Sequence, residues 1–392
     1  MAMKGLRIRS YDEQMDRGGV IELERRCSVG PSDRVFHLFT DTLGDPIARI
    51  RNSPLFKMLV AELENELVGV IQGSIKTVTI QKASKDLSKV GYISGLRVSP
   101  LHRRKGIGMS LVNHLEQWFI DNQVNFAYMA TEIDNEASVK LFVNKLGYMH
   151  FRTPAILINP VYQQSCHIST DVKIRKLRTE EAEYLYRNYI CSADFFPSDI
   201  DKILQNKLSL GTWVAYDCAD QSQTLFGQNG QVPNNWAMLS IWNSGKVFKL
   251  RIGKVPLSWF LYSKGFGLVD KVFPCFKMPA LADFLDPFGF YFVYGLYCDG
   301  PQSGRLVQAL FRFVHNMAAA NSMDECKAIV TEVGGYDTWR LHIPHWKLLS
   351  CPEDLWCIKA LKPEERNTIQ EFTKTQPTSK TTKPLFVDPR DI

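Results

Sequence analysis

The sequence has few of the features that mark secreted or membrane proteins. Its nine cysteines are scattered without a Cys-x-x-Cys pair, and it has no Asn-x-Ser/Thr glycosylation acceptor. Free thiols in a reducing compartment are therefore expected, which favours an intracellular protein over a disulfide-bonded secreted one. No apolar run reaches the ~18 residues that cross a bilayer. The first residues lack the apolar core of a signal peptide, so we expect no membrane association.

Patterns typical of metal binding and nucleic-acid binding are also missing. His342 and His345 flank Pro344, but no further ligands stand at a fitting spacing, so ordinary packing is preferred and no metal is predicted. The net charge of +6 is too small and too spread out to predict direct nucleic-acid binding, although it suits an anionic cofactor. The densest basic run is His102–Lys105. Nuclear import is a weaker interpretation of that run than the one given below.

The composition is that of a folded protein with more than one domain. Apolar residues make up 45% of the 392 residues and charged residues 22%, and one hydrophobic core rarely serves a chain of this length. The first part alternates β-branched runs with amphipathic stretches, which predicts an α/β fold with a mixed sheet and helices on both faces. Strands are expected at 6–9, 58–60, 68–78, 92–98, 126–131 and 148–158, and helices at 20–26, 107–118 and 136–146.

The rest of the chain repeats this order in a diverged form. Gly295-Leu296 echoes Gly95-Leu96, and Thr331-Glu332 follows at the spacing of Thr131-Glu132. Together these matches favour a second, degenerate copy over an unrelated α/β domain. We therefore expect one domain over 1–162, a second over 168–362, and a flexible linker and tail over 363–392, in which Phe386-Val387 docks onto the body. Asp220–Asn235, rich in Gln, Asn and Gly, is expected to be a mobile loop.

The most informative segment joins an expected strand to a strongly amphipathic helix. Arg103-x-x-Gly106-x-Gly108 lacks Cβ atoms at two points, so that backbone N–H groups can approach an anion closely. The first N–H groups of a helix have no internal partner and lie at the positive end of its dipole. A pyrophosphate is the ligand that such a loop binds best, and Arg104 and Lys105 add positive charge. A P-loop is excluded because no Gly-Lys-Ser/Thr follows.

With these residues the sequence resembles the GNAT N-acetyltransferase superfamily over about its first 160 residues, and the plant hookless-type N-acetyltransferases nearly from end to end. The superfamily motifs are Leu96-Arg97-Val98, Arg103-Arg104-Lys105-Gly106-Ile107-Gly108, Asn135-x-x-Ser138 and Phe142-x-x-x-x-Gly147-Tyr148. The hookless-type phrases are Glu24-Arg25-Arg26-Cys27, Phe39-Thr40-Asp41, Leu43-Gly44-Asp45-Pro46, Phe151-Arg152-Thr153-Pro154, Phe195-Phe196-Pro197, Asp199-Ile200-Asp201, Asn206–Thr212, Ile343–Lys347 and Phe386–Arg390.

The resemblance implies a GNAT fold with acetyl-CoA as acetyl donor, lying between the strand that ends at Val98 and the strand that ends near Thr131. It also implies that the Val98 N–H faces the thioester oxygen and stabilises the negative charge that develops there. Asn135 would hydrogen-bond the pantetheine arm, and a helix N-cap is its equally suitable structural role. The expected donor-binding residues are Leu96, Arg97, Val98, Arg103, Arg104, Lys105, Gly106, Ile107, Gly108, Met109, Asn135, Ser138 and Phe142.

The acid and the base are less clear from the sequence. Many members of the superfamily protonate the leaving thiolate with a tyrosine where this chain has Phe142, and Tyr128 is one alternative. Glu132, at the end of an expected central strand, could deprotonate the acceptor ammonium, or it could be a surface carboxylate or a helix cap. Asp41 and Asp45 lie where the resemblance implies acceptor binding, with loop capping as the alternative.

Two functions remain open at this stage. The first is an N-acetyltransferase acting on a primary amine, with a protein lysine or N-terminus favoured over a small molecule. The second is an acetyl-CoA-binding regulatory or scaffold protein that is catalytically weak or inactive and acts through partners, which Phe142 and the degenerate second copy favour. The second copy lacks the basic run and is expected not to bind acetyl-CoA, but to shape the acceptor groove or contact a partner. The resemblance also implies a role in plant growth control and a nuclear location.

Overall fold

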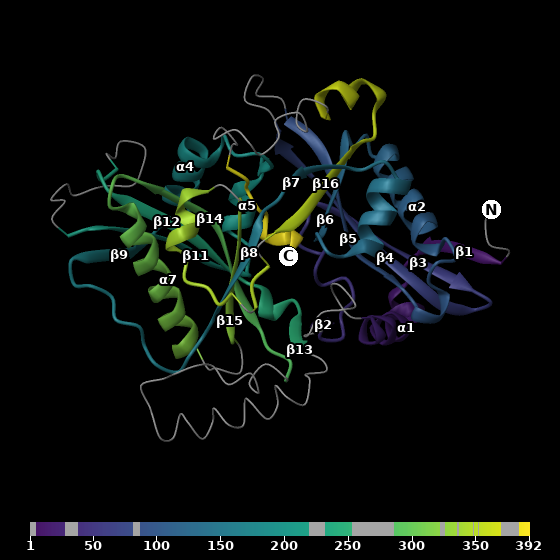
Figure 1. Ribbon diagram of the computed structural model, residues 1–392, viewed down its shortest axis with the longest axis horizontal. Helices are drawn as coiled ribbons and strands as arrows, with labels where there is room; N and C mark the ends of the chain where they lie inside the picture. Colours follow the sequence, from purple (N-terminus) through teal and green to yellow (C-terminus); the bar gives the residue numbers. More distant parts are fainter. Residues whose placement is uncertain are drawn as a thin grey trace.

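The protein is described by a computed structural model covering residues 5–27, 38–80, 87–218, 232–252, 286–321, 326–334, 337–347, 349–351, 353–369 and 384–392. Two mixed sheets lie side by side, with the N-terminal end at one extreme and the C-terminal end between them (Figure 1). The predicted mobile loop at Asp220–Asn235 lies largely outside the described residues.

The first sheet has eight strands in the order β1-β3-β4-β5-β6-β16-β7, with β10 paired to β4. Two positive-φ residues, Glu64 and Asn65, turn β3 into β4, as the sequence predicts for a tight hairpin. The strands are β1 (Leu6–Ser10), β3 (Leu55–Leu63), β4 (Glu66–Thr79), β5 (Leu87–Val98), β6 (Phe126–Glu132), β7 (Met149–Arg152), β10 (Phe196–Pro197) and β16 (Asp354–Ala360).

Helices cover both faces of this sheet. Helix α1 (Glu13–Arg26) begins where the Asp12 side chain accepts from the backbone N–H groups of its first turn, and it packs on β3 and β4. Helix α2 (Ile107–Asp121) packs its apolar side against the opposite face. A Cβ at Gly91 would lie 2.8 Å from the Phe119 ring, so glycine lets α2 approach the sheet. The expected helix at 136–146 is α3 (Glu136–Val139) continued by the wider π-turn η2 (Lys140–Lys145).

The second sheet has the order β8-β15-β14-β12-β11-β9, and α7 (Ser303–Ala320) covers one face of it. Its strands are β8 (Ala155–Pro160), β9 (Val172–Lys176), β11 (Ser209–Asp217), β12 (Trp236–Asn243), β14 (Phe290–Asp299) and β15 (Ala328–Val333). The other elements are α4 (Thr179–Leu185), η3 (Tyr186–Ile190), α5 (Ile200–Leu204), the pair β2 (Leu38–Asp41) and β13 (Lys249–Ile252), and the short turns η1 (Pro100–His102), η4 (Ser244–Lys246), η6 (Thr338–His342), η7 (Pro363–Glu365) and η8 (Pro389–Asp391).

The two sheets exchange a strand. Strand β16, late in the chain, inserts between β6 and β7 of the first sheet, whereas β8 leaves the first sheet and pairs antiparallel with β15 of the second. The sheets therefore do not divide the chain at the expected 162/168 boundary. Each sheet is completed by a strand from the other half, because β-pairing is satisfied by whichever edge lies close in space.

The two halves also share one hydrophobic core. Tyr128 and Val90 of the first sheet pack in the same cluster as Trp236 and Phe292 of the second. The chain after Lys383 enters this core: Phe386 and Val387 are buried, as the sequence predicts, and so are Asp388–Asp391. In the described part of 363–392, Phe386–Asp391 are therefore buried against the body, where a flexible tail was expected. No described helix is long and apolar enough to cross a membrane.

Candidate functional site

Strands β5 and β6 separate in the middle of the first sheet. Their parallel pairing ends at Ile93 and Met129, although β5 continues to Val98 and β6 to Glu132. The register of β5 with β4 shifts by one residue next to Gly95, whose φ is +60°, so a bulge bends β5 away from β6. We call this unpaired stretch between the two strand ends the opening; it lies where the resemblance implies the donor.

The backbone of Val98 faces this opening. Ser99 N donates to the carbonyl of Val68, its opposite residue on β4, at 2.8 Å. Antiparallel pairs alternate between bonded and non-bonded positions, so the neighbouring pair Val98–Gly69 is non-bonded. The Val98 N–H therefore points away from β4 and toward β6. The Val98 carbonyl accepts from Arg103 Nε at 3.3 Å, which ties the following loop to the strand end.

The loop after β5 presents an uncapped helix N-terminus. Gly106 is the N-cap of α2 with φ +89° and supplies no side chain, and no described side chain caps this end. The first helical hydrogen bond runs from Ser110 N to the Gly106 carbonyl, which leaves the preceding N–H groups for another acceptor. Arg103, Arg104 and Lys105 are exposed, and none of them forms an ion pair with a described residue. The loop therefore fits an anion such as a pyrophosphate.

The two glycines of this loop serve different purposes. Gly106 needs its left-handed φ, although a Cβ there would meet nothing within 4 Å. Gly108 has an ordinary helical conformation, and a Cβ there would make a normal 3.5 Å contact with Leu141. The fold therefore does not require glycine at 108.

The other expected donor residues surround the opening. Leu96 and Arg97 are half-buried near the end of β5, and Arg97 forms an ion pair with Glu24 of α1 at 3.3 Å. Ile107 is buried under the first turn of α2, whereas Met109 is exposed on that turn. The role of Arg97 seen here is to join β5 to α1.

Asn135 has the structural role that the sequence offered as an alternative. It caps α3, and its Oδ1 accepts from Ser138 N at 3.3 Å, so its side-chain amide N–H groups remain for a ligand. Phe142 is 2% exposed and packs edge-on against Tyr148 with ring centroids 5.2 Å apart. Tyr148 in turn donates to Glu116 at 2.7 Å. The position of Phe142 therefore supplies no proton.

Glu132 lies at the end of β6 opposite Asp354 of β16. Side chains alternate along a strand, so Glu132 shares a face with Tyr128, and this face is the one turned toward the second half. Tyr128 is fully buried, and its hydroxyl donates to Asp391 at 2.6 Å. Burial is the main cause that raises the pKa of Tyr128, so this hydroxyl keeps its proton.

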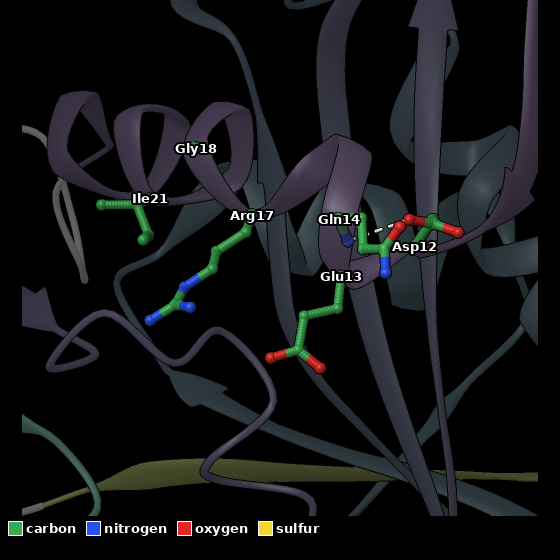
Figure 2. Close-up of a pocket in the computed structure, with 6 residues that line it drawn as sticks. All are labelled: Asp12, Glu13, Gln14, Arg17, Gly18 and Ile21. Atoms are coloured by element: carbon green, nitrogen blue, oxygen red, sulfur yellow. Dashed lines mark hydrogen bonds between the residues drawn. The ribbon is translucent and has the colours of Figure 1, made fainter.

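Asp41 and Asp45 are engaged in local loop structure. Asp41 accepts from Leu43 N at 3.0 Å, and Asp45 forms an ion pair with Arg51 at 2.5 Å. Nearby, an open pocket of about 950 Å³ lies along the first turns of α1. Figure 2 shows its lining side chains, which include Glu13 and Arg17. Arg17 reaches the Gly44 carbonyl at 2.7 Å, so the pocket adjoins the Asp41–Asp45 loop.

The second half repeats the opening but fills it with its own chain. Strands β14 and β15 stop pairing at Val293 and Thr331, and Gly295 has φ +60° like Gly95. The opening keeps a cavity of only about 40 Å³, which is lined in part by Pro384–Val387. At the start of α7, Arg305 is bound to Asp171 and Asp217. Among its described residues, the start of α7 therefore offers no free arginine, and the chain's own segment lines the cavity.

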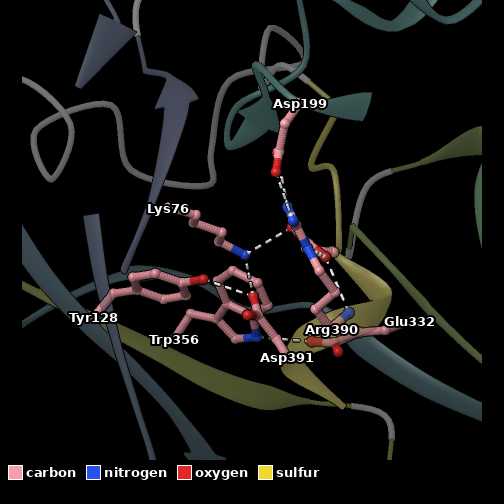
Figure 3. A network of polar contacts seen from close by, with 8 residues as sticks. Lys76, Tyr128, Asp199, Glu332, Trp356, Arg390 and Asp391 are labelled. Carbon is pink, nitrogen blue, oxygen red and sulfur yellow. Dashed lines mark hydrogen bonds and ion pairs between the residues drawn. The ribbon is translucent and has the colours of Figure 1, made fainter. Parts of the chain in front are cut away.

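A buried polar network that the sequence did not predict lies between the sheets (Figure 3). Asp391 accepts from Tyr128 and from Lys76, the latter at 2.5 Å, and Lys76 also pairs with Asp388 at 3.2 Å. Arg390 binds Asp388 at 2.8 Å and Asp199 at 2.7 Å. Two of the hookless-type phrases, Asp199-Ile200-Asp201 and Phe386–Arg390, supply members of it, but neither phrase predicts its chemistry.

Glu332 of β15 borders this network. Its Oε1 accepts from Trp356 Nε1 at 2.7 Å. Burial is the main cause that raises its pKa well above the usual range, and Asp354 and Asp391 raise it further.

His345 Nδ1 lies 2.9 Å from the Ile343 carbonyl, and the described residues contain no cluster that could hold a metal.

Comparisons with known proteins identify the family. Residues 21–148 match the model of the acetyltransferase (GNAT) family. The chain is 43% identical to "Probable N-acetyltransferase HLS1" of Arabidopsis thaliana, over 98% of this chain and 99% of that protein. It is 32% identical to "Acetyl transferase GW6a" of Oryza sativa subsp. japonica, over 99% of this chain and 97% of that protein.

A solved structure shares the two-sheet fold. Saccharomyces cerevisiae N-myristoyltransferase with bound myristoyl-CoA superposes with a TM-score of 0.55 at 9% identity, covering 92% of this chain and 80% of that protein. This likeness covers both halves of the chain, and the two mixed sheets are compatible with the second GNAT-like domain that the sequence repeat predicts. The chain therefore belongs to the plant hookless-type N-acetyltransferases, acyltransferases with a GNAT fold.

Proposed function

We propose that this protein transfers an acetyl group from acetyl-CoA to a primary amine, with a protein lysine or N-terminus preferred over a small molecule. The observation that carries the proposal is the opening between β5 and β6 beside an uncapped helix N-terminus with the exposed cations Arg104 and Lys105. The pyrophosphate would lie on Gly106 and Gly108 with Arg103, Arg104 and Lys105 around it, and the pantetheine arm between Leu96–Val98 and β6.

The chain's own groups suit acyl transfer at this place. The Val98 N–H, turned toward the opening, would donate to the thioester oxygen as negative charge develops on it. Asn135 would keep its cap and offer its amide N–H groups to the pantetheine arm. Because Phe142 has no proton to give, the thiolate would leave without a tyrosine acid, which its pKa of ~8.5 permits near neutral pH. Glu132 remains a candidate base at the outer end of β6.

The division of labour between the halves is part of the proposal. The first domain (1–162 in the sequence prediction) would bind the donor with β16 as its completing strand, and the second (168–362) would form the far wall of the acceptor site. The Asp41–Asp45 loop would contribute to the rim of that site. Nuclear location and a role in growth control remain proposals supported by family membership alone, and a fluorescent fusion in plant cells tests the location.

The transfer proposal is tested with the purified full-length chain, acetyl-CoA and a mixture of peptides that carry free N-termini and lysines. Acetylated amines identified by mass spectrometry, with release of one CoA thiol per acetyl group, would support it. The alternative is a catalytically weak scaffold that binds acetyl-CoA, which the buried Phe142 favours. Micromolar acetyl-CoA binding without transfer to any peptide amine would favour that alternative.

A further inference from the structure

Asp391 lies directly beneath the point where β5 and β6 separate. Tyr92 and Tyr128 are paired neighbours on these strands, one residue before the last pair, and their rings lie 4.8 Å apart on the face turned toward the second half. Tyr128 donates to Asp391 at 2.6 Å. Helix α2, whose N-terminus would hold the pyrophosphate, covers the opposite face. A donor threaded from α2 through the opening would therefore bring its thioester toward Asp391.

Only one oxygen of the Asp391 carboxylate accepts hydrogen bonds from described residues. Its Oδ2 accepts from both Lys76 and Tyr128. Its Oδ1 is buried and has no hydrogen-bond partner among the described residues, and the side chain is 4% exposed. A buried carboxylate oxygen without a donor is costly, so this atom is suited to bind a donor that arrives with a ligand.

The bonded groups around Asp391 carry more carboxylates than cations. Among the described residues, the ion pairs of this network join the cations Lys76 and Arg390 to the carboxylates of Asp199, Asp388 and Asp391 (Figure 3). Glu332 lies close enough to Asp391 for the charge of Asp391 to raise the pKa of Glu332. Buried carboxylates in excess of cations favour an incoming positive charge, and a primary ammonium supplies both the charge and the missing N–H donor.

The segment that carries Asp391 is firmly placed. Phe386 N donates to the Asp194 carbonyl at 2.9 Å, and Asp194 N donates to the Pro384 carbonyl at 3.0 Å. The Phe386 ring packs against Phe196 and Tyr186. Arg390 then binds both oxygens of Asp199, at 2.7 and 3.0 Å. The opening of the second half thus anchors a segment whose end reaches the opening of the first.

We propose that Asp391 is the catalytic base of this acyltransferase: its Oδ1 binds the ammonium of the acceptor amine and takes its proton. The inference rests on the proposed transfer reaction and names the group that activates its acceptor. The free amine then attacks the thioester carbon, the C–N bond forms and the C–S bond breaks. The electron pair leaves with sulfur, and the second proton of the nitrogen goes to the thiolate. Asp391 returns the first proton to solvent, so each turnover releases one proton, the acetylated amine and the CoA thiol.

The surroundings suit a base. Burial raises the pKa of Asp391 and Asp388 raises it further, whereas Lys76 and the Tyr128 hydrogen bond lower it. A raised pKa brings a carboxylate closer to the pH at which it accepts a proton efficiently. The titratable or charged groups that face Asp391 are Lys76 on β4, Tyr92 on β5, Tyr128 on β6, Glu332 on β15, and Asp388 and Arg390 of its own segment.

The test compares Asp391→Asn with the wild-type full-length chain. Acetyl-CoA affinity is measured by calorimetry. CoA release is measured with a thiol reagent, with either poly-L-lysine or the peptide mixture described above as the acceptor. We expect unchanged acetyl-CoA affinity and a fall in kcat/KM of about 100-fold or more. In the wild type kcat/KM should rise with pH as Asp391 loses its proton. Asp391→Asn should lose this rise, and Tyr128→Phe should move it to higher pH, because the Tyr128 hydrogen bond lowers the pKa.

Two variants separate chemistry from structure. Asp201→Asn, on α5 and 38% exposed, is the matched control and should behave as wild type. Asp199→Asn loosens the Arg390 anchor but keeps the Asp391 carboxylate, and it should retain the pH dependence.

Wild-type kcat/KM in Asp391→Asn would overturn the inference while leaving the transferase intact. Equal losses and flat pH profiles in Asp199→Asn and Asp391→Asn, or loss of acetyl-CoA binding in Asp391→Asn, would assign Asp391 a structural role instead. No CoA release by the wild type with either acceptor would remove the proposed function, and this inference with it.

Discussion

Gly108→Glu should abolish acetyl-CoA binding without harming the fold. A Cβ at position 108 makes only ordinary contacts, the nearest being Leu141 at 3.5 Å, so the backbone of α2 accepts a residue larger than glycine there. A carboxylate about 5 Å from a pyrophosphate is repelled by ~3 kcal/mol per phosphate charge at an effective dielectric constant near 20. A loss of at least ~3 kcal/mol weakens binding by more than about 100-fold.

The same substitution should leave the melting temperature unchanged or raise it. Glutamate has a better helix propensity than glycine, and a negative charge in the first turn interacts favourably with the helix dipole. Calorimetric titration with acetyl-CoA measures the binding, and thermal unfolding measures the stability. Gly18→Glu is the control, because Gly18 lies in α1 where an added Cβ meets nothing within 4 Å. Micromolar binding by Gly108→Glu would refute the placement of the pyrophosphate.

Two further substitutions test the buried charges. Lys76→Met should lower the free energy of unfolding by about 3–5 kcal/mol, because Asp388 and Asp391 lose a cation that is 2% exposed; an unchanged urea midpoint would contradict this account of the network. Burial raises the pKa of Asp337 to about 6. Since the folded state then holds this proton more tightly than the unfolded state, stability should fall as the pH rises from about 4 to 6. Asp337→Asn should remove that fall and stabilise the protein at pH 7 by up to about 3 kcal/mol, and equal urea midpoints at pH 7 would speak against it.

Local features of the fold could be predicted because they depend on neighbouring residues. The Glu64-Asn65 turn, the amphipathic face of α2 and the Gly106–Gly108 loop all follow from side-chain period and backbone freedom within a few positions. The repeat was recognisable because Gly295 and Gly95 occupy the same bulge, with φ +60° at both. The loop for which we propose phosphate binding could therefore be singled out before the fold was known.

The exchange of β8 and β16 could not be predicted in this way. The alternation in Asp354–Ala360 indicates a strand, but the sequence does not say which edge it pairs with. The consequence is practical, since a chain of residues 1–165 lacks β16 and leaves β6 and β7 without their common partner. Such a truncation damages the first sheet as well as removing the second half, so a loss of activity in it does not reveal the role of the second half.

Asp391 was missed for the same reason. Its chemistry depends on Lys76 and Tyr128, which lie 315 and 263 positions away in the chain. Nothing beside it in sequence distinguishes it from a surface carboxylate. Glu132, in contrast, could be proposed as a base from the sequence because it ends an expected central strand. The structure places it on the same face as Tyr128.

A crystal structure of the full-length chain with acetyl-CoA tests the central claim most directly. The account predicts the pyrophosphate on the N–H groups that follow Gly106, the pantetheine arm between the ends of β5 and β6, and the acetyl group on the side of Tyr92 and Asp391. The opening between β14 and β15 should still hold Phe386 and Val387. Acetyl-CoA bound between β14 and β15, or bound outside the first opening, would contradict the account.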